Sequence, residues 1–202
     1  MNSIDFISLI PFVFITTFTP GPNNIACASM AISFGIKKSM CFIYGIFIGF
    51  TTVLLFAGFF SNILLKMVPG LEPVMRLIGA VYILYLAFNL LKTDYSFQQK
   101  AKQVKPFSFN QGVLLQFLNP KGIIYAITLY SAFLYSITDK PQYIILFAFT
   151  LSSIAFLSLI LWALFGAIIS RFLYRERTKR IINTTLALLL GYTAVKLTGI
   201  VF

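Results

Sequence analysis

The residues best suited to binding chemistry form two short polar interruptions in otherwise apolar stretches. The first interruption comprises Thr19, Pro20, Gly21, Pro22, Asn23 and Asn24. Proline lacks a backbone N–H and clashes with the preceding turn, which costs about 3 kcal/mol in a helix interior. We therefore expect an apolar helix to break or unwind near residues 18–24, with two amide side chains beside the freed backbone groups.

The second interruption comprises Asn119, Pro120, Lys121 and Gly122. Asparagine favours the N-cap of a helix and proline the first helical position, so a new helix is expected to start here. Thr19 and Pro20 fit the same rule. Each site should begin a half-helix whose free N–H groups and positive dipole end suit an anionic group such as a carboxylate.

Lys121 allows two interpretations. A lysine in the middle of a membrane span costs about 2.5–3.5 kcal/mol on insertion scales unless it reaches water, a counter-ion or a substrate. In the first interpretation, Lys121 faces a central cavity and attracts a substrate carboxylate. In the second, it extends along its helix to the cytoplasmic surface, since it lies only about ten residues into its apolar stretch.

The elements that position these residues are predicted to be membrane-spanning helices. Of the 202 residues, 59% are apolar and 10% are charged, against about 45–50% and 25% in soluble domains. The mean hydropathy is +0.90. These values exclude a soluble domain, a disordered chain and a disulfide-stapled module, and the absence of histidine excludes a histidine-based metal site or general base.

Six apolar stretches are long enough to cross a bilayer, which takes about 20 residues. They span residues 6–30, 40–64, 70–91, 111–136, 142–169 and 181–201. No basic residue precedes the first stretch, so we expect it to be a retained span and not a cleaved leader. The fold class is therefore predicted to be all-α, in a polytopic membrane protein with broken helices one and four.

The net charge of +11 is not an argument for nucleic acid, because the basic residues cluster in gaps between the apolar stretches. Eleven lie after the first, third and fifth stretches, against four on the other side, which places these gaps in the cytoplasm and both termini outside. The eleven are Lys37, Lys38, Lys92, Lys100, Lys102, Lys105, Arg171, Arg175, Arg177, Lys179 and Arg180.

A polar linker over residues 93–110 divides the chain into two three-span halves, 1–92 and 111–202. An odd number of spans per half makes the second half enter the membrane from the opposite side, which predicts a 3+3 inverted repeat. The two half-helices would then run in opposite directions from a shared central space. Broken helices at matching places in two halves are typical of a transporter with its binding site near the bilayer midplane.

Other residues are predicted to have packing roles or exclude functions. Gly45 and Gly49 have the four-residue spacing that lets helices approach closely, and an exposed seam of this kind is compatible with a homodimer. No carboxylate lies deep in a span, which leaves the coupling ion open and disfavours metal transport. No phosphate-binding glycine loop is present, so we expect no cofactor and no direct use of ATP.

With these two motifs, the chain resembles the LysE/RhtB amino-acid exporter family over essentially its whole length, and the paired asparagines resemble its cysteine and O-acetylserine branch. The resemblance implies secondary export of amino acids from the bacterial cytoplasm across the inner membrane. This export would be driven by an ion gradient, with the proton as the first candidate for the coupling ion. It also implies a site built by residues 19–24 with residues 119–121 opposite. Some members carry an acidic residue near the first motif, and this chain carries none there.

The function expected from these observations is export of small neutral amino acids or their derivatives, similar either to cysteine and O-acetylserine or to homoserine and threonine, with no enzymatic activity. An intramembrane enzyme is the less favoured alternative, because the chain offers no histidine and no deep acid. A second alternative is a membrane subunit or scaffold that transports nothing. A dry, tightly packed centre around Pro20 and Pro120 would favour the scaffold.

Overall fold

The computed structural model describes residues 4, 6–60 and 105–172 together with scattered positions in 77–91 and 181–195. Throughout this described part the chain is helical, with short turns and no strand. The third and sixth predicted spans, 70–91 and 181–201, and most of the 93–110 linker lie outside the described residues apart from single helical positions such as Leu77 and Leu190. The inverted repeat as a whole is therefore not tested by the structure.

The first predicted span is broken where its prolines lie. Helix α1 covers Phe6–Phe18 and helix α2 covers Pro22–Phe34. Between them, Gly21 is the N-cap of α2 in an extended conformation, and Pro22 occupies its first turn. The missing N–H of a proline is not needed at this position, which is why the sequence restarts a helix here. The expectation that Thr19 caps this helix and Pro20 begins it is therefore wrong by two residues.

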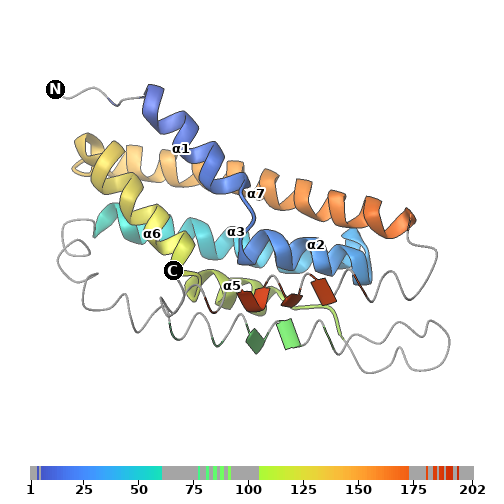
Figure 1. Cartoon of the computed structure of the whole chain (residues 1–202). Helices are drawn as coiled ribbons and strands as arrows, with labels where there is room; N and C mark the ends of the chain where they lie inside the picture. Colours follow the sequence, from blue (N-terminus) through green and yellow to red (C-terminus); the bar gives the residue numbers. More distant parts are fainter. Residues whose placement is uncertain are drawn as a thin grey trace.

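A single residue joins α2 to helix α3, which covers Ile36–Phe59. This residue, Gly35, has a φ of 81° and a ψ of 161°, a region that is essentially restricted to glycine. The chain reverses there, so that α2 and α3 lie side by side and run in opposite directions (Figure 1). Lys37 and Lys38 consequently lie exposed in the first turn of α3 and not in a gap that extends to residue 39.

The fourth predicted span, 111–136, is also interrupted. It comprises helix α5 (Phe109–Phe117), helix α6 (Pro120–Thr128), a π-helical turn (Leu129–Phe133) and a 3-10 turn (Tyr135–Ile137). Ser108 and Gln111 form a capping box that fixes the start of α5. Helix α7 follows over Pro141–Phe172.

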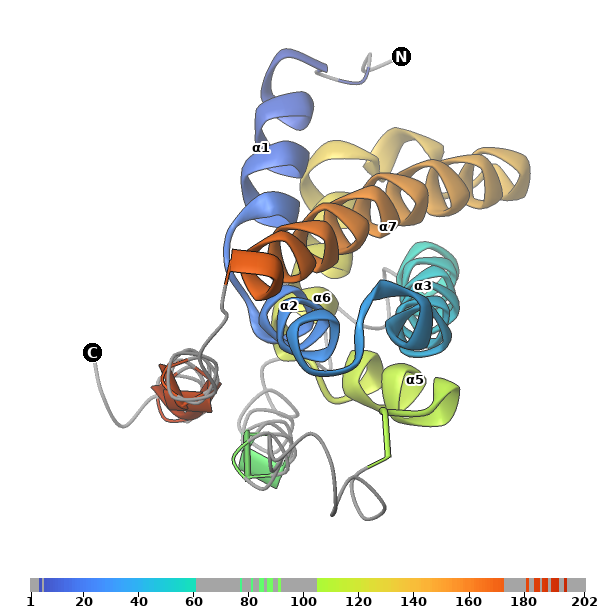
Figure 2. The same cartoon turned by 90° about the vertical axis from the view of Figure 1, so that its right-hand side faces the viewer.

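The longest helices form the frame around the two breaks. Helix α7 packs against α2 and α3, and α3 packs against α5 (Figure 2). Helices α2 and α6 lead away from the breaks in opposite directions (Figure 1). By length and apolar composition, Ile36–Phe59 and Pro141–Ile168 could each cross a membrane.

The glycines of α3 bring it close to α5. A Cβ atom added to Gly45 would lie 2.1 Å from the carbonyl oxygen of Phe109, and one added to Gly49 would lie 3.0 Å from Cβ of Gln116. Both glycines therefore contact a helix of the same chain. This agrees with the packing role predicted for them, and α5 covers the face that an exposed seam would have offered to a second copy.

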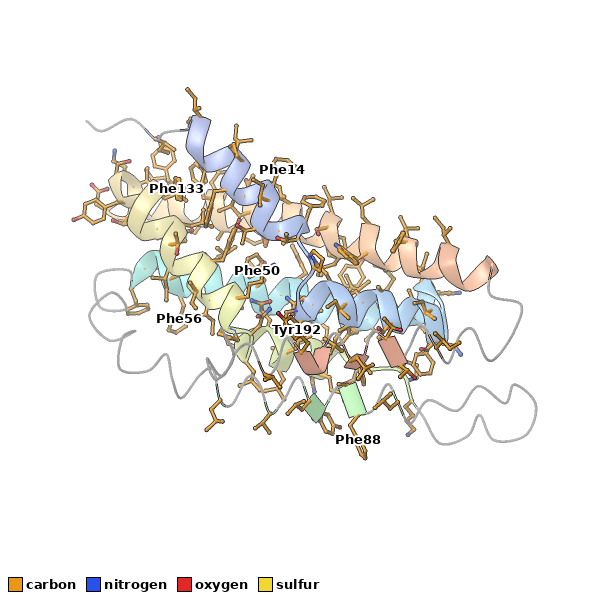
Figure 3. All side chains as sticks on the ribbon, viewed as in Figure 1. Phe14, Phe50, Phe56, Phe88, Phe133 and Tyr192 are labelled. Atoms are coloured by element: carbon orange, nitrogen blue, oxygen red, sulfur yellow. The ribbon has the colours of Figure 1, made fainter. Side chains whose placement is uncertain are left out.

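Much of the outer surface of the helices is apolar. Phe14, Phe56 and Phe88 project outward, whereas Phe50 lies between helices and is 7% exposed (Figure 3). Outward aromatic and aliphatic side chains on long apolar helices fit a lipid surround. The breaks thus lie inside a bundle whose exterior suits a bilayer.

Candidate functional site

The two helix breaks, about one hundred residues apart in the chain, are in direct contact. The Asn119 side chain donates to Oδ1 of Asn23 at 3.1 Å, and Asn23 Nδ2 donates to Oε1 of Gln116 at 2.7 Å. Lys121 Nζ donates to the carbonyl oxygen of Thr19 at 3.2 Å. The residues singled out in the two motifs therefore form one polar junction.

The cap of α6 fixes the direction of this amide chain. Asn119 Oδ1 accepts from the backbone N–H of Lys121 at 3.1 Å, and only an oxygen can accept there. The Asn119 nitrogen must then face Asn23, which presents its own oxygen in return and its nitrogen to Gln116. The chain of donors ends at Nε2 of Gln116, which is buried and has no partner among the described residues.

Side chains satisfy the carbonyl groups that the break leaves free at the end of α1. Asn24 Nδ2 donates to the carbonyls of Thr17 and Thr19, at 3.1 and 3.0 Å. Ser158 and Trp162 of α7 donate to the carbonyls of Thr17 and Phe18, at 3.1 and 3.3 Å respectively. The break is thereby stabilised by protein groups, and a ligand ammonium would have to compete with Lys121 or Asn24 for the Thr19 carbonyl.

The two half-helix starts differ. At α6, the Asn119 side chain occupies the Lys121 N–H, and the N–H of Gly122 bonds the Asn119 carbonyl at 3.0 Å. At α2, Gly21 provides no side-chain cap, and the N–H groups of Asn23 and Asn24 have no acceptor among the described residues. The expectation that both helix starts offer free donors is therefore correct only for α2, because Asn119 caps its own helix.

A cavity of about 550 Å³, including the space at its open mouth, lies at this junction. Polar groups from both breaks lie at one part of its wall, and apolar side chains form much of the rest. The lining residues are Thr16, Thr17, Gly21, Pro22, Asn23, Asn24, Ile46, Phe47, Phe50, Gln116, Asn119, Lys121, Gly122, Tyr125, Ser152, Ala155, Phe156 and Leu159.

Most of the predicted site residues line this cavity, but three do not. The cavity wall includes Gly21, Pro22, Asn23, Asn24, Asn119 and Lys121. Thr19 contributes only its carbonyl oxygen to the junction, because its hydroxyl donates back to the carbonyl of Ile15. Pro20 is exposed, and Pro120 is buried outside the lining.

The structure decides between the two interpretations of Lys121. Its side chain lines the cavity, and a Cβ added to Gly21 would lie 3.2 Å from its Nζ atom. The ammonium group is thus directly beside the start of α2. Of the five acidic residues, only Asp139 lies in the described part of the chain, in the turn before α7.

The sequence reading missed several polar residues of the cavity, above all Gln116, which is 1% exposed. The sequence does distinguish this residue, because a glutamine within an apolar span is unusual and marks a functional candidate. Thr16, Thr17 and Tyr125 were missed as well, and they also line the cavity. Within the described residues, no group of histidine, cysteine or acidic side chains could hold a metal ion.

Comparison with known proteins finds the amino-acid exporter family over nearly the whole chain. A family model described as LysE type translocator matches residues 14–199. No solved structure matches the chain significantly.

Curated relatives extend over almost the full length of both proteins. A cysteine/O-acetylserine efflux protein of Klebsiella pneumoniae is 34% identical over 191 residues, which cover 94% of this chain and 95% of that protein. The protein of the same name from Escherichia coli K12 is 33% identical over 186 residues, or 92% of this chain and 93% of the relative. The chain therefore belongs to the LysE type translocator family of membrane proteins.

Proposed function

We propose that this protein exports small neutral amino acids, with cysteine and O-acetylserine as the first candidates, through the cavity at the two helix breaks. The observation that carries the proposal is the convergence of Lys121 and the uncapped start of α2 on one side of that cavity. The relatives named as cysteine/O-acetylserine efflux proteins supply the candidate substrates.

The polar side of the cavity suits the carboxylate of an amino acid. Lys121 Nζ supplies a positive charge beside Gly21. The N–H groups of Asn23 and Asn24 supply donors at the positive end of the α2 dipole. Hydrogen bonds to charged groups contribute about 1.5–3 kcal/mol each, so this corner can hold an anion that has left water.

The remaining wall suits a small side chain with little charge. Ile46, Phe47, Phe50, Phe156 and Leu159 provide apolar contacts, and no carboxylate of the described chain lies there to pair with a basic side chain. The hydroxyls of Thr16, Thr17, Tyr125 and Ser152 could accommodate a polar group of a short side chain. A cavity of this composition favours small neutral substrates over lysine or arginine.

For the substrate ammonium, the available acceptor is the carbonyl of Thr19, which Lys121 and Asn24 occupy in this structure. We infer that Lys121 leaves the Thr19 carbonyl when substrate binds and pairs with the substrate carboxylate. The substrate ammonium then takes its place at the Thr19 carbonyl. The total positive charge beside Thr19 would be nearly conserved in this exchange, which keeps its cost low.

Transport requires access from each side in turn. We propose that the halves 1–92 and 111–202 rock against each other around the junction, driven by an ion gradient, with the proton as the first candidate. The protein would lie in a bacterial inner membrane with both termini outside, as the distribution of basic residues favours. A scaffold without transport is less well supported, because the two breaks meet at a cavity with polar groups on one part of its wall.

The test is efflux of labelled O-acetylserine or cysteine from loaded proteoliposomes. Replacing Lys121 by methionine keeps the length of the side chain and removes its charge, so we expect at least a tenfold fall in initial efflux rate. Lys38→Met, at an exposed position, is the matched control and should transport normally. Equal rates for the wild type and Lys121→Met would refute the site, and no efflux by the wild type would refute the function.

A further inference from the structure

We propose that Gln116 is a substrate-binding residue whose side-chain amide donates to the carboxylate of the transported amino acid. The inference deepens the proposed function and rests on it. Gln116 belongs to neither of the two proline motifs, and it lies in the last turn of α5, shortly before the second break.

The side-chain atom of Gln116 that has no partner among the described residues, Nε2, must be a donor. The backbone N–H of Lys121 fixes the orientation of the Asn119 amide, and the contacts from Asn119 to Asn23 and from Asn23 to Gln116 carry that orientation onward. Since Gln116 Oε1 accepts from Asn23, the NH₂ group is the end that remains. A ligand that satisfies it has to offer an acceptor.

The Gln116 side chain is also buried, which makes an unpaired donor unusual. The Gln116 side chain is 1% exposed and its Nε2 atom has no partner among the described residues, although it lines the cavity. Buried polar groups nearly always have a hydrogen-bond partner, and an exception calls for an explanation. A ligand acceptor that binds in the cavity provides this explanation.

The Gln116 amide lies beside Gly122, at the start of α6. A Cβ atom added to Gly122 would lie 2.3 Å from Gln116 Nε2, so this glycine leaves the space that the amide group occupies beside the start of α6. The preceding residue, Lys121, places its ammonium beside Gly21. A carboxylate has two oxygens, and in this proposal Lys121 binds one and the Gln116 amide binds the other.

The experiment compares wild type, Gln116→Met and Gln116→Glu in proteoliposomes. Methionine preserves the length of the side chain without a donor, and glutamate replaces the donor by a negative charge. We expect the KM of Gln116→Met to rise about tenfold for both O-acetylserine and cysteine, by the same factor, with a smaller change in turnover. Gln116→Glu should be weaker still. Asn110→Asp, an exposed amide-to-acid change on the same helix, should match the wild type.

A second measurement separates ligand binding from a merely structural role. Inhibition of efflux by L-alanine and by L-alaninamide, which lacks the carboxylate, is compared in wild type and Gln116→Met. The wild type should prefer the acid strongly, and this preference should shrink in the variant, which a general loosening of the fold would not produce. This comparison in the wild type is informative even if the variants do not fold.

An unchanged KM in Gln116→Met, an effect confined to O-acetylserine, or a wild type that does not distinguish acid from amide would each overturn the assignment. These outcomes differ from failure of the proposed function. If the wild type moves no amino acid, the proposed function is wrong. If it moves them and Gln116→Met behaves identically, only the role of Gln116 is wrong.

Discussion

Replacing Gly45 by alanine tests the contact that holds the second break in place. The added Cβ would lie 2.1 Å from the Phe109 carbonyl oxygen, 2.9 Å from its carbonyl carbon and 3.1 Å from the Val113 nitrogen. Ordinary contacts begin at 3.4 Å, so α3 and α5 must separate by about 1.3 Å at this point. All three atoms belong to the backbone, and no side-chain rotation can relieve the overlap.

Overpacking of this kind costs about 1–3 kcal/mol. Alanine also has the better helix propensity by about 1 kcal/mol, so the control must share that gain. Gly191→Ala is suitable, because no atom of the described residues lies within 4 Å of the added atom. We expect Gly45→Ala to unfold at a temperature several degrees below that of Gly191→Ala, since about 1 kcal/mol corresponds to roughly 2–4 °C for a chain of this size.

Thermal unfolding of the two purified variants in the same detergent measures the difference, and vesicle efflux measures its functional consequence. Because α5 carries Gln116, its displacement should lower efflux as well as stability. Equal unfolding temperatures for the two variants would refute the close packing of α3 on α5.

Three further changes probe the breaks and the helix reversal. Asn119→Ala removes the cap of α6 and the first link of the amide chain, and should lower the free energy of unfolding by about 0.5–2 kcal/mol in denaturant titrations; no loss would contradict the cap. Gly35→Ala forces alanine into a region essentially restricted to glycine, and should destabilise by about 1–3 kcal/mol in the same assay, although nothing lies within 4 Å of the added Cβ. Trp162→Phe removes the donor to the Phe18 carbonyl and should lower the unfolding temperature by a few degrees, whereas an unchanged temperature would show that this bond does not support the break.

The positions of the helix breaks could be predicted from the sequence because local chemistry determines them. Pro20, Gly21 and Pro22 together disfavour a continuous helix, and Asn119 with Pro120 favours a helix start. These effects operate within a few residues and need no knowledge of the rest of the chain. The family relationship was also within reach, because the motifs that carry it are contiguous in sequence.

The direction in which a side chain points could not be predicted, since it depends on how each helix is rotated against its neighbours. Gly45 and Gly49 were predicted to pack helices together, but which helix they would meet was not, and they face α5. Gln116 was overlooked because only the packing of α5 beside the first break turns its amide toward Asn23. For the same reason the sequence left the direction of Lys121 open, and the contact with Thr19 settles it.

The central claim is that the amino acid binds where the two helix breaks meet, and protection from chemical labelling tests it most directly. Thr16 lines the cavity and is half-buried, so a cysteine there, in a chain with the exposed Cys41 replaced by alanine, reports occupancy through its rate of reaction with a maleimide. O-Acetylserine is the ligand to add, because free cysteine would consume the reagent. We expect O-acetylserine to slow the labelling of Thr16→Cys in a saturable manner and to leave the labelling rate of the exposed control Lys38→Cys unchanged. Unchanged labelling of Thr16→Cys at O-acetylserine concentrations that saturate efflux would show that the amino acid does not bind at the helix breaks.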